Sequence, residues 1–298
     1  RFRYDDRLST AIISTGGTLA VMIPPSIVLI VYGVLTETSI GKLFMAGVVP
    51  GLLTAAGLIM TVIFLAQGRN LAPPGAPFDL RTAMRQSSSV WPMCLLVVLI
   101  IASIYTGTAS PTEAGALGAT GALVLALFQR TMRLKSFVNG LSHTVQTTVF
   151  IVTIIYCSSI FSTYLTYSQV TQELISAVKD FGLSPGMVLL IIVGVLLVLG
   201  MVLDQLAILS LTMPLAFPIV TALGYDPIWF GIIVTKTVEI GLLTPPLGLN
   251  VFVTASRTGV PIHTVFRGVI PFLVTESVIL AILILFPDLS LWLPRQMS

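Results

Sequence analysis

Residues 241–250 read Gly-Leu-Leu-Thr-Pro-Pro-Leu-Gly-Leu-Asn, and they interrupt an apolar segment that is long enough to cross a bilayer. Proline lacks a backbone N–H and clashes with the preceding helical turn, so a Pro-Pro pair breaks a helix and frees backbone carbonyls. A single break of this kind can have a purely structural role, as a kink that shapes how helices pack. Its meaning depends on whether the chain contains a counterpart.

A counterpart lies near the N-terminus, 221 residues earlier and without a gap. Three motifs match at this one offset: Tyr4-Asp5 with Tyr225-Asp226, Pro24-Pro25 with Pro245-Pro246, and Gly47-Val48-Val49-Pro50 with Gly268-Val269-Ile270-Pro271. Membrane helices can resemble one another through composition alone, but three motifs at one offset favour an internal repeat. Broken helices at matching places in two halves of a chain are typical of secondary transporters and point to the binding site.

The composition indicates an integral membrane protein. Of the 298 residues, 55% are hydrophobic and 9% are charged, whereas a soluble domain carries roughly 25% charged residues. Several apolar runs exceed the roughly 18 residues that indicate a membrane span. The expected fold class is therefore an all-α polytopic bundle in a lipid bilayer, with inverted repeats, broken helices and a re-entrant hairpin.

Apolar runs and turn residues predict the order of the elements. The expected elements are a broken helix over 8–36, helices over 42–67, 89–106, 112–129 and 138–168, an interfacial amphipathic piece from Val170 to Phe181, hairpin arms over 186–203 and 206–222, a second broken helix over 228–256 and a last helix over 262–287. We expect residues 1–67 and 169–298 to form the two repeats, and 68–168 to be connecting transmembrane helices. The hairpin of the first repeat is expected to precede residue 1 in a longer protein.

Lys and Arg residues predict the orientation, because positively charged loops stay on the cytoplasmic side. They form four clusters: Arg1, Arg3 and Arg7; Arg69, Arg81 and Arg85; Arg130, Arg133 and Lys135; and Arg257 with Arg267. All four clusters lie on one side only if the arms around Asp204 enter and leave the membrane on the same side. The segment 186–222 is then a re-entrant hairpin, and the two repeats have inverted topology.

The two breaks offer groups that can bind ions and anions. Freed carbonyls with hydroxyl or amide oxygens suit a hard cation such as sodium, and the N-termini of half-helices suit an anion. The candidate substrate-binding residues are Thr18, Ser26, Gly248 and Asn250. The candidate cation ligands are Gly17, Pro24, Gly241, Thr244, Pro245 and, at the hairpin tip, Asp204.

Three charged motifs have structural alternatives to a functional role. Asp204 lies between apolar arms, where an ionisable residue is usually functional, although a shallow hairpin would let it touch headgroup water. Lys236 and Glu239 share a helix face, which predicts either a self-satisfied ion pair or a role in coupling. Ser110-Pro111-Thr112-Glu113 predicts a capping box at a helix N-terminus.

The absent motifs exclude several classes of enzyme. The sequence contains no Gly-x4-Gly-Lys-Ser/Thr phosphate loop, no His-Glu-x-x-His, no Cys-x-x-Cys and no Gly-x-Ser-x-Gly. His143 and His263 are far apart, so we expect a protein that is not an enzyme. The net charge is +3, and the positively charged residues lie in short loops between helices, so the charge does not indicate a nucleic-acid partner.

Taken together, the motifs resemble the large membrane (M) subunit of tripartite ATP-independent periplasmic (TRAP) transporters, over essentially the whole chain. The runs that carry the resemblance are Gly17-Thr18, Ile23-Pro24-Pro25-Ser26-Ile27, Tyr32-Gly33-Val34-Leu35-Thr36, Ser110-Pro111-Thr112-Glu113-Ala114, Gly200-Met201-Val202-Leu203-Asp204 and residues 241–250. Two features depart from the family pattern: Gln205 stands where a small residue or Pro often follows the Asp, and the Lys236/Glu239 pair is unusually charged.

The resemblance implies sodium-driven import of small organic anions, such as dicarboxylates or sialic acid, by an elevator mechanism in the bacterial inner membrane. It implies transported sodium ions, a small membrane (Q) subunit and a periplasmic substrate-binding protein. By resemblance, the first sodium site uses the break from Gly17 to Pro25 with a first hairpin, and the second uses the tip near Asp204 with the break from Gly241 to Thr244. The alternatives are a proton-coupled or exchange-type anion transporter of the same architecture, and a channel or scaffold subunit.

Overall fold

The computed structural model describes residues 4–68, 91–129 and 132–296, and all regular secondary structure in these ranges is helical. The chain divides into two compact units, one formed by residues 1–73 and 154–296 and the other by residues 74–153. The first unit contains both broken helices and the hairpin. The predicted helix over 89–106 begins outside the described residues. Outside them also lie six arginines of the predicted loops, namely Arg1, Arg3, Arg69, Arg81, Arg85 and Arg130.

The helices of the first unit follow the predicted order, and each predicted segment is confirmed to within a few residues. In chain order they are α1 (Asp6–Met22), α2 (Ile27–Leu35), α3 (Ile40–Gly68), the second part of α7 (Leu134–Tyr167), α8 (Val170–Asp180), α9 (Pro185–Gly200), α10 (Gln205–Ala222), α11 (Pro227–Gly241), α12 (Leu249–Thr258) and α13 (Ile262–Leu285). Two short elements, α14 (Asp288–Leu291) and η1 (Pro294–Gln296), follow the last helix and were not predicted.

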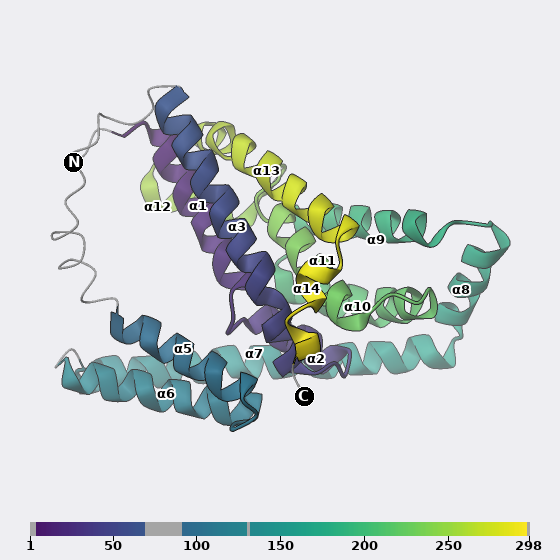
Figure 1. The fold of residues 1–298 in the computed structure, drawn as a ribbon, viewed down its shortest axis with the longest axis horizontal. Helices are drawn as coiled ribbons and strands as arrows, with labels where there is room; N and C mark the ends of the chain where they lie inside the picture. The colour runs from purple at the N-terminus through teal and green to yellow at the C-terminus, as the bar shows by residue number, and fades with distance from the viewer. Residues whose placement is uncertain (1–3, 69–90, 130–131, 297–298) are drawn as a thin grey trace. The chain divides into compact units, whose positions relative to one another are not determined.

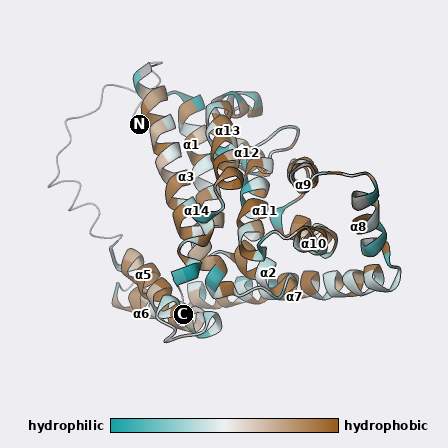
Figure 2. Cartoon of the chain, turned by 45° about the vertical axis from the view of Figure 1, so that its right-hand side comes forward, coloured by the Kyte–Doolittle hydropathy of each residue, from teal (hydrophilic) through white to brown (hydrophobic). Residues whose placement is uncertain are grey.

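The apolar helices have lengths that suit a membrane. Among the described residues, five helices are long and apolar enough to span it, namely α3, α7, α10, α13 and α6 (Pro111–Phe128), and the bent pair α1/α2 provides a sixth candidate. Figure 2 shows these helices dominated by hydrophobic residues, with hydrophilic ones mainly at their ends and in α8. The polytopic all-α fold class is therefore confirmed.

Both Pro-Pro pairs break a helix where predicted. Helix α1 ends at Met22, before Pro24-Pro25, and α2 continues at an angle of 42°. Helix α11 ends at Gly241, and α12 begins at Leu249 after Gly248, whose φ of +52° favours glycine. Both Pro–Pro peptide bonds are cis. The two breaks interrupt the helical hydrogen-bond pattern at corresponding places in the repeat.

The two broken helices run antiparallel to each other. Tyr32, near the end of the first, donates a hydrogen bond from its hydroxyl to the carbonyl of Pro227 at the start of the second (2.7 Å). At the opposite ends, the Ser14 hydroxyl donates to Thr254 Oγ1 (2.9 Å). Contacts of α2 with α11 and of α1 with α12 follow the same order. This is the arrangement that repeats of inverted topology require.

Helices α9 and α10 form a hairpin whose tip comprises residues 201–204. They lie side by side in Figure 1, and α9 also packs along α11. Helix α9 has 16 residues, fewer than the about 20 that usually cross the hydrocarbon core, which favours the predicted re-entrant hairpin. A hydrogen bond links the C-terminal part of α7 to α10, because the Ser158 hydroxyl donates to the Ser210 carbonyl (2.8 Å).

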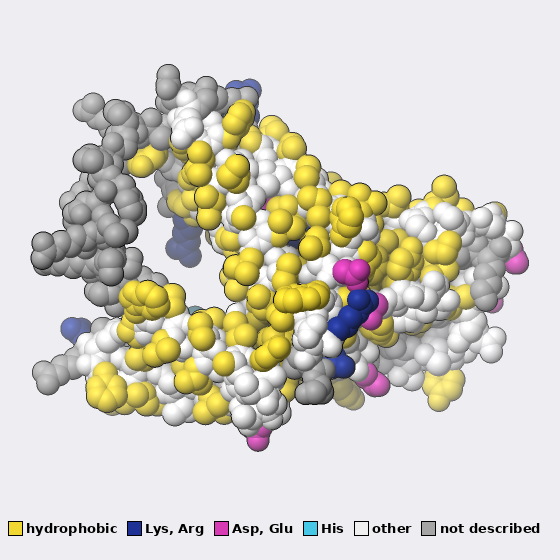
Figure 3. Space-filling model, viewed as in Figure 1, with side chains coloured by type: hydrophobic (Ala, Val, Ile, Leu, Met, Phe, Trp, Pro, Cys, Tyr) yellow, Lys and Arg dark blue, Asp and Glu magenta, His cyan; other side chains and the backbone are white. Residues whose placement is uncertain are grey.

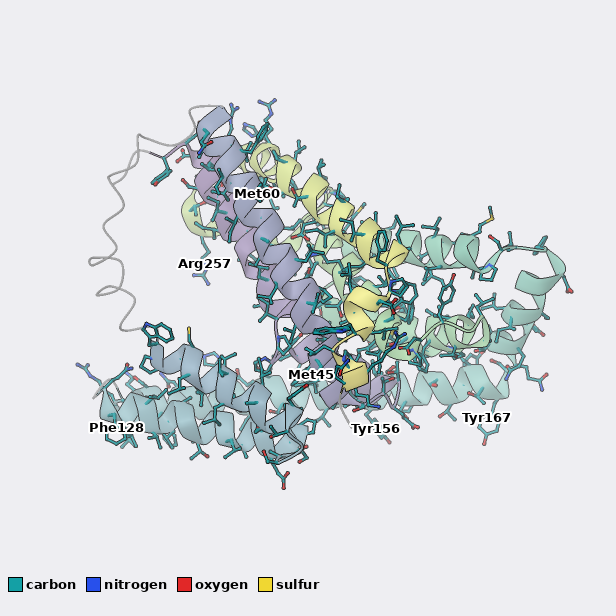
Figure 4. The ribbon with its side chains drawn as sticks, viewed as in Figure 1. Met45, Met60, Phe128, Tyr156, Tyr167 and Arg257 are labelled. Atoms are coloured by element: carbon teal, nitrogen blue, oxygen red, sulfur yellow. The ribbon has the colours of Figure 1, made fainter. Side chains whose placement is uncertain are left out.

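The core of the first unit joins α1, α3, α12, α13 and the second break. Its buried residues include Leu8, Leu58, Val251, Phe272 and Leu243, which lies inside the break itself. On α3, Met45 is 1% exposed whereas Met60 is 68% exposed, and both are labelled in Figure 4. Figure 3 shows hydrophobic side chains spread over the outer faces of α3 and α13. An apolar exterior of this kind suits contact with lipid tails.

The second unit consists of α5 (Trp91–Tyr105), α6 and the first part of α7. Helices α5 and α6 pack closely, and a Cβ added to Gly118 would lie 2.8 Å from Ile100 Cδ1. The capping box predicted at residues 110–113 is confirmed. The Glu113 N–H donates to Ser110 Oγ at 3.3 Å, and the Ser110 N–H donates to Glu113 Oε2 at 2.7 Å.

Candidate functional site

The end of the first hairpin arm lies directly against the end of α11, where the second break begins. Gly200 ends α9 and Gly241 ends α11, and a Cβ added to Gly241 would lie 2.6 Å from Gly200 Cα. The reciprocal Cβ on Gly200 would lie 2.9 Å from Gly241 Cα. The two backbones are therefore in contact, and only glycine fits at either position. The family resemblance implied that the tip near Asp204 and this break form one site, and the ends of α9 and α11 are in contact at Gly200 and Gly241.

Asp204 caps the second arm of this hairpin. Its Oδ1 atom accepts hydrogen bonds from the backbone N–H groups of Leu206 (2.9 Å) and Ala207 (3.1 Å). A carboxylate at an N-cap satisfies free N–H groups and interacts favourably with the helix dipole. Capping therefore explains an aspartate at the tip, and a role in cation binding has to be tested separately from it.

The second break folds into a compact turn. The Thr244 hydroxyl donates to the Ile240 carbonyl (2.6 Å), and the Asn250 N–H donates to the Leu242 carbonyl (3.2 Å). Buried Gly248 leaves no room for a side chain, because an added Cβ would lie 2.9 Å from Phe266 Cε1. Pro245 is exposed. Some of the carbonyls that were expected to be free are thus engaged locally, while the Thr244 oxygen keeps lone pairs for a cation.

The polar groups of the first break also form hydrogen bonds with neighbouring residues of their own segment. Ser26 caps α2 by accepting from the Leu29 N–H (3.4 Å), and its hydroxyl donates to the Val21 carbonyl. Thr18 is fully buried, and its hydroxyl donates to the Thr15 carbonyl (2.8 Å). Pro24 is buried while Gly17 is exposed, with open space around an added Cβ. Thr18 and Gly17 lie on α1, and Pro24 and Ser26 lie in the turn between α1 and α2, far from the hairpin tip in sequence.

A hydrogen-bond chain links the two broken helices. The Ser14 hydroxyl donates to Thr254 Oγ1 (2.9 Å), and the Thr254 hydroxyl donates to the Asn250 carbonyl (2.8 Å). Asn250 was predicted through its side chain. Its backbone carbonyl accepts the Thr254 hydroxyl within α12, and Ser14 on α1 donates to that same hydroxyl oxygen.

Replacing Thr254 with valine should loosen this connection. The variant keeps the shape of the side chain but removes the hydroxyl, and we expect a loss of about 0.6–1 kcal/mol, as for interhelical hydrogen bonds in membranes. Thermal unfolding in detergent measures the loss. Thr258→Val is the matched control, because the Thr258 hydroxyl donates only to Thr254 O within α12 (2.7 Å). Equal unfolding temperatures for the two variants would contradict the bridging role.

A buried cluster of charges lies one turn before the second break. The predicted ion pair is confirmed, with Lys236 Nζ 3.0 Å from Glu239 Oε2. The sequence analysis missed two further members: Glu276 on α13, which also pairs with Lys236, and Thr54 on α3, whose Oγ1 accepts from Lys236 Nζ at 2.9 Å. The sequence feature that could have identified Glu276 is its position as a lone carboxylate in the middle of the last apolar helix, where ionisable residues are usually functional.

The described residues hold no acidic metal centre. No group of three or more His, Cys, Asp or Glu side chains in the described ranges could hold a metal ion. A sodium ion at either break would therefore rely on backbone carbonyl and hydroxyl oxygens, with Asp204 as the one carboxylate at the tip.

Comparison with known proteins gives consistent matches over the whole chain. The family model described as "Tripartite ATP-independent periplasmic transporter, DctM component" matches residues 1–289. A C4-dicarboxylate TRAP transporter large permease protein of Pseudomonas aeruginosa is 41% identical, over 100% of this chain and 70% of the relative. A sialic acid TRAP transporter large permease protein of Vibrio cholerae is 33% identical, over 98% and 69%. An ectoine/5-hydroxyectoine TRAP transporter large permease protein of Ruegeria pomeroyi is 34% identical, over 97% and 68%.

Proposed function

This chain belongs to the DctM component family of tripartite ATP-independent periplasmic transporters, and from this premise we propose that it imports small organic carboxylates by sodium-coupled secondary transport. Because the members of this family are transporter permeases, the chain is a transporter component and not an enzyme. Relatives named for C4-dicarboxylates and sialic acid support a carboxylate substrate. We take C4-dicarboxylates as the first substrates to test.

The observation that carries the proposal is the contact between Gly200 and Gly241. The contact supports a common site, because Asp204 follows Gly200 at the hairpin tip and the second break begins after Gly241. Broken helices near the middle of a membrane supply ion ligands from unwound backbone, and half-helix N-termini attract anionic substrate groups. We assign the second sodium site to Asp204, Gly241, Thr244 and Pro245, and substrate contacts to Gly248 and Asn250. Gly17, Pro24, Thr18 and Ser26 play the equivalent parts at the first break.

The antiparallel arrangement of the broken helices supports an elevator cycle. Inverted repeats allow two related conformations that open to opposite sides. In this proposal the hairpins and broken helices within the repeats 1–67 and 169–298 form the mobile unit, which carries the substrate past a fixed scaffold, and residues 68–168 connect the two repeats. The partners are a small membrane subunit and a periplasmic substrate-binding protein, and the complex resides in the bacterial inner membrane.

Asp204→Asn separates cation binding from helix capping. Asparagine caps helices about as well as aspartate but has no charge, so the fold should persist while the apparent sodium affinity falls about tenfold, the equivalent of roughly 1.4 kcal/mol. Uptake of a radiolabelled C4-dicarboxylate is measured in proteoliposomes that hold the complete transporter complex, with the binding protein outside and a varied inward sodium gradient.

Asp226→Asn is the matched control. Asp226 caps α11 with the same geometry, its Oδ1 accepting from Ile228 N (2.8 Å) and Trp229 N (3.1 Å), but it lies at the end of α11 away from the break. It should leave sodium dependence unchanged. Wild-type behaviour of Asp204→Asn would mean that Asp204 is only a cap. Uptake by the wild-type complex without sodium would overturn sodium coupling itself and favour proton coupling or exchange.

A further inference from the structure

An apolar hollow lies in the first unit beside its last helical elements. The hollow has a volume of about 440 Å³, which falls within the roughly 300–1,000 Å³ of small-molecule pockets. Its walls come from α3, the end of α13 and the segment around α14, and they include Val49, Leu285, Phe286, Asp288, Leu289 and Trp292. Apart from Asp288 these side chains are apolar, so the hollow suits a hydrocarbon chain.

The hollow lies where several apolar helices end. The indole N–H of Trp229, at the start of α11, donates to the Leu283 carbonyl near the end of α13 (2.9 Å). Tyr32, near the end of α2, donates to the Pro227 carbonyl at the start of α11 (2.7 Å), and α3 follows α2 directly in the chain. The end of α13, the start of α11 and the turn from α2 to α3 therefore lie at one end of the unit. Helix α14 packs against both α3 and α11.

Aromatic side chains indicate that this end lies at a membrane interface. Trp292 lines the hollow and is 58% exposed. Tyr225 stacks on Trp229 with ring centroids 5.2 Å apart. Trp and Tyr are enriched where a membrane meets water, because these side chains combine an apolar body with a polar group. A ligand in the hollow would therefore be close to both lipid tails and lipid headgroups.

A pair of opposite charges accompanies the hollow. Arg295 Nη1 lies 2.7 Å from Oδ1 of Asp288, which lines the hollow, and the two side chains are 63% and 80% exposed. An ion pair this exposed adds little to stability. A guanidinium has five N–H donors and a carboxylate has two acceptor oxygens, so one bond leaves both groups able to bind a ligand. The described ranges contain no second ion-pair partner for either group.

The other charges at this end of the unit do not favour an anionic ligand. Lys42 lies in the first turn of α3, but Glu37 precedes α3 and Asp226 precedes α11, and all three side chains are exposed. Together with the pair these residues supply two cations and three carboxylates. Figure 3 shows basic and acidic side chains next to each other in this area, bordered by hydrophobic ones. Without a surplus of positive charge, the area suits a headgroup that carries both signs.

We propose that the hollow and the Asp288–Arg295 pair form a binding site for a zwitterionic phospholipid with an ammonium headgroup. One acyl chain fills the hollow, the phosphate accepts hydrogen bonds from the free donors of Arg295, and the ammonium donates to Asp288. A hollow of this size accommodates a chain, whereas a transmembrane helix about 10–12 Å wide would need a groove along its whole length. The inference does not depend on the substrate or on sodium coupling.

Native mass spectrometry of the purified transporter complex in detergent can count bound lipids. The complex is titrated separately with phosphatidylethanolamine and with phosphatidylglycerol of the same acyl chains. We expect one tightly bound phosphatidylethanolamine, with an affinity about tenfold higher than that of phosphatidylglycerol, because one charge-assisted hydrogen bond is gained. Val49→Phe fills the hollow and should weaken the binding of both lipids. Val278→Phe, at a 52% exposed position of α13 that does not line the hollow, is its control.

Two further variants test the headgroup contacts. Asp288→Asn removes the partner of the ammonium while Arg295 still binds the phosphate, so the preference for phosphatidylethanolamine over phosphatidylglycerol should disappear. Arg295→Gln removes the charged partner of the phosphate and should weaken the binding of both lipids about tenfold. Arg257→Gln is the matched control, because Arg257 is exposed in the last turn of α12 and does not line the hollow.

Three results would overturn the inference. Equal or stronger binding of phosphatidylglycerol by the wild type would show that the headgroup is not recognised as zwitterionic. Unchanged binding in Val49→Phe would place the lipid elsewhere on the protein. A complete complex without a tightly bound lipid would show that the hollow is empty or covered by another subunit. The first and third results come from the wild type alone, so they decide the question even if a variant fails to fold.

Discussion

Gly241→Ala should reduce sodium-coupled uptake about tenfold or more. The new Cβ would lie 2.6 Å from Gly200 Cα and 3.2 Å from the Leu197 carbonyl oxygen. Backbone atoms cannot rotate away as a side chain can, so α9 and α11 must move apart. Overpacking of a close-packed interior costs about 1–3 kcal/mol, and 1.4 kcal/mol corresponds to about tenfold in affinity. The uptake rate against sodium concentration, in proteoliposomes with the complete complex, measures the effect.

The chain offers a matched control on the facing helix. Gly194 lies on α9, six residues before Gly200, and an added Cβ there meets no atom within 4 Å. Gly194→Ala should therefore keep wild-type uptake, whereas Gly200→Ala should reproduce the defect from the other side of the contact. If Gly241→Ala transports normally with an unchanged sodium dependence, the tip and the break do not form a common site.

The broken helices could be predicted because their cause is local. Pro24-Pro25 and Pro245-Pro246 cannot continue a helix whatever surrounds them, and α1 and α11 accordingly end at Met22 and Gly241. The repeat then indicated that the two breaks are equivalent. The hairpin was predictable for the same kind of reason, since two apolar arms meet at Asp204, a strong helix N-cap.

The contacts within the site could not be predicted because they depend on how distant helices pack. The sequence around Gly200 does not indicate its contact with Gly241. The sequence around Thr54 likewise does not indicate its hydrogen bond with Lys236. Spacing along one helix predicted the pair Lys236/Glu239, but Glu276 joins it from a helix 37 residues further on. The sequence likewise suggested open carbonyls at the second break, where the fold uses the Leu242 carbonyl to hold Asn250 N–H.

Lys236→Met should destabilise the protein by about 3–5 kcal/mol, the usual cost of removing one partner from a buried ion pair. Methionine fills a similar volume, so the expected loss arises from Glu239 and Glu276 rather than from a cavity. Both carboxylates lose their cation at 0% exposure. Thermal or denaturant unfolding of the purified complex measures the effect. Lys42→Met, at an exposed position on α3, is the control and should change stability by no more than about 0.5 kcal/mol.

Removing all three charges distinguishes a lost interaction from unpaired charges that stay behind. Replacing a whole buried ion cluster with apolar residues is often neutral or stabilising by about 1–4 kcal/mol, so Lys236→Met combined with Glu239→Leu and Glu276→Leu should recover most of the stability. A triple variant less stable than Lys236→Met would show that the cluster holds α11 to α13 by its own attraction. Recovery of stability in the triple variant would instead show that the fold does not need the cluster.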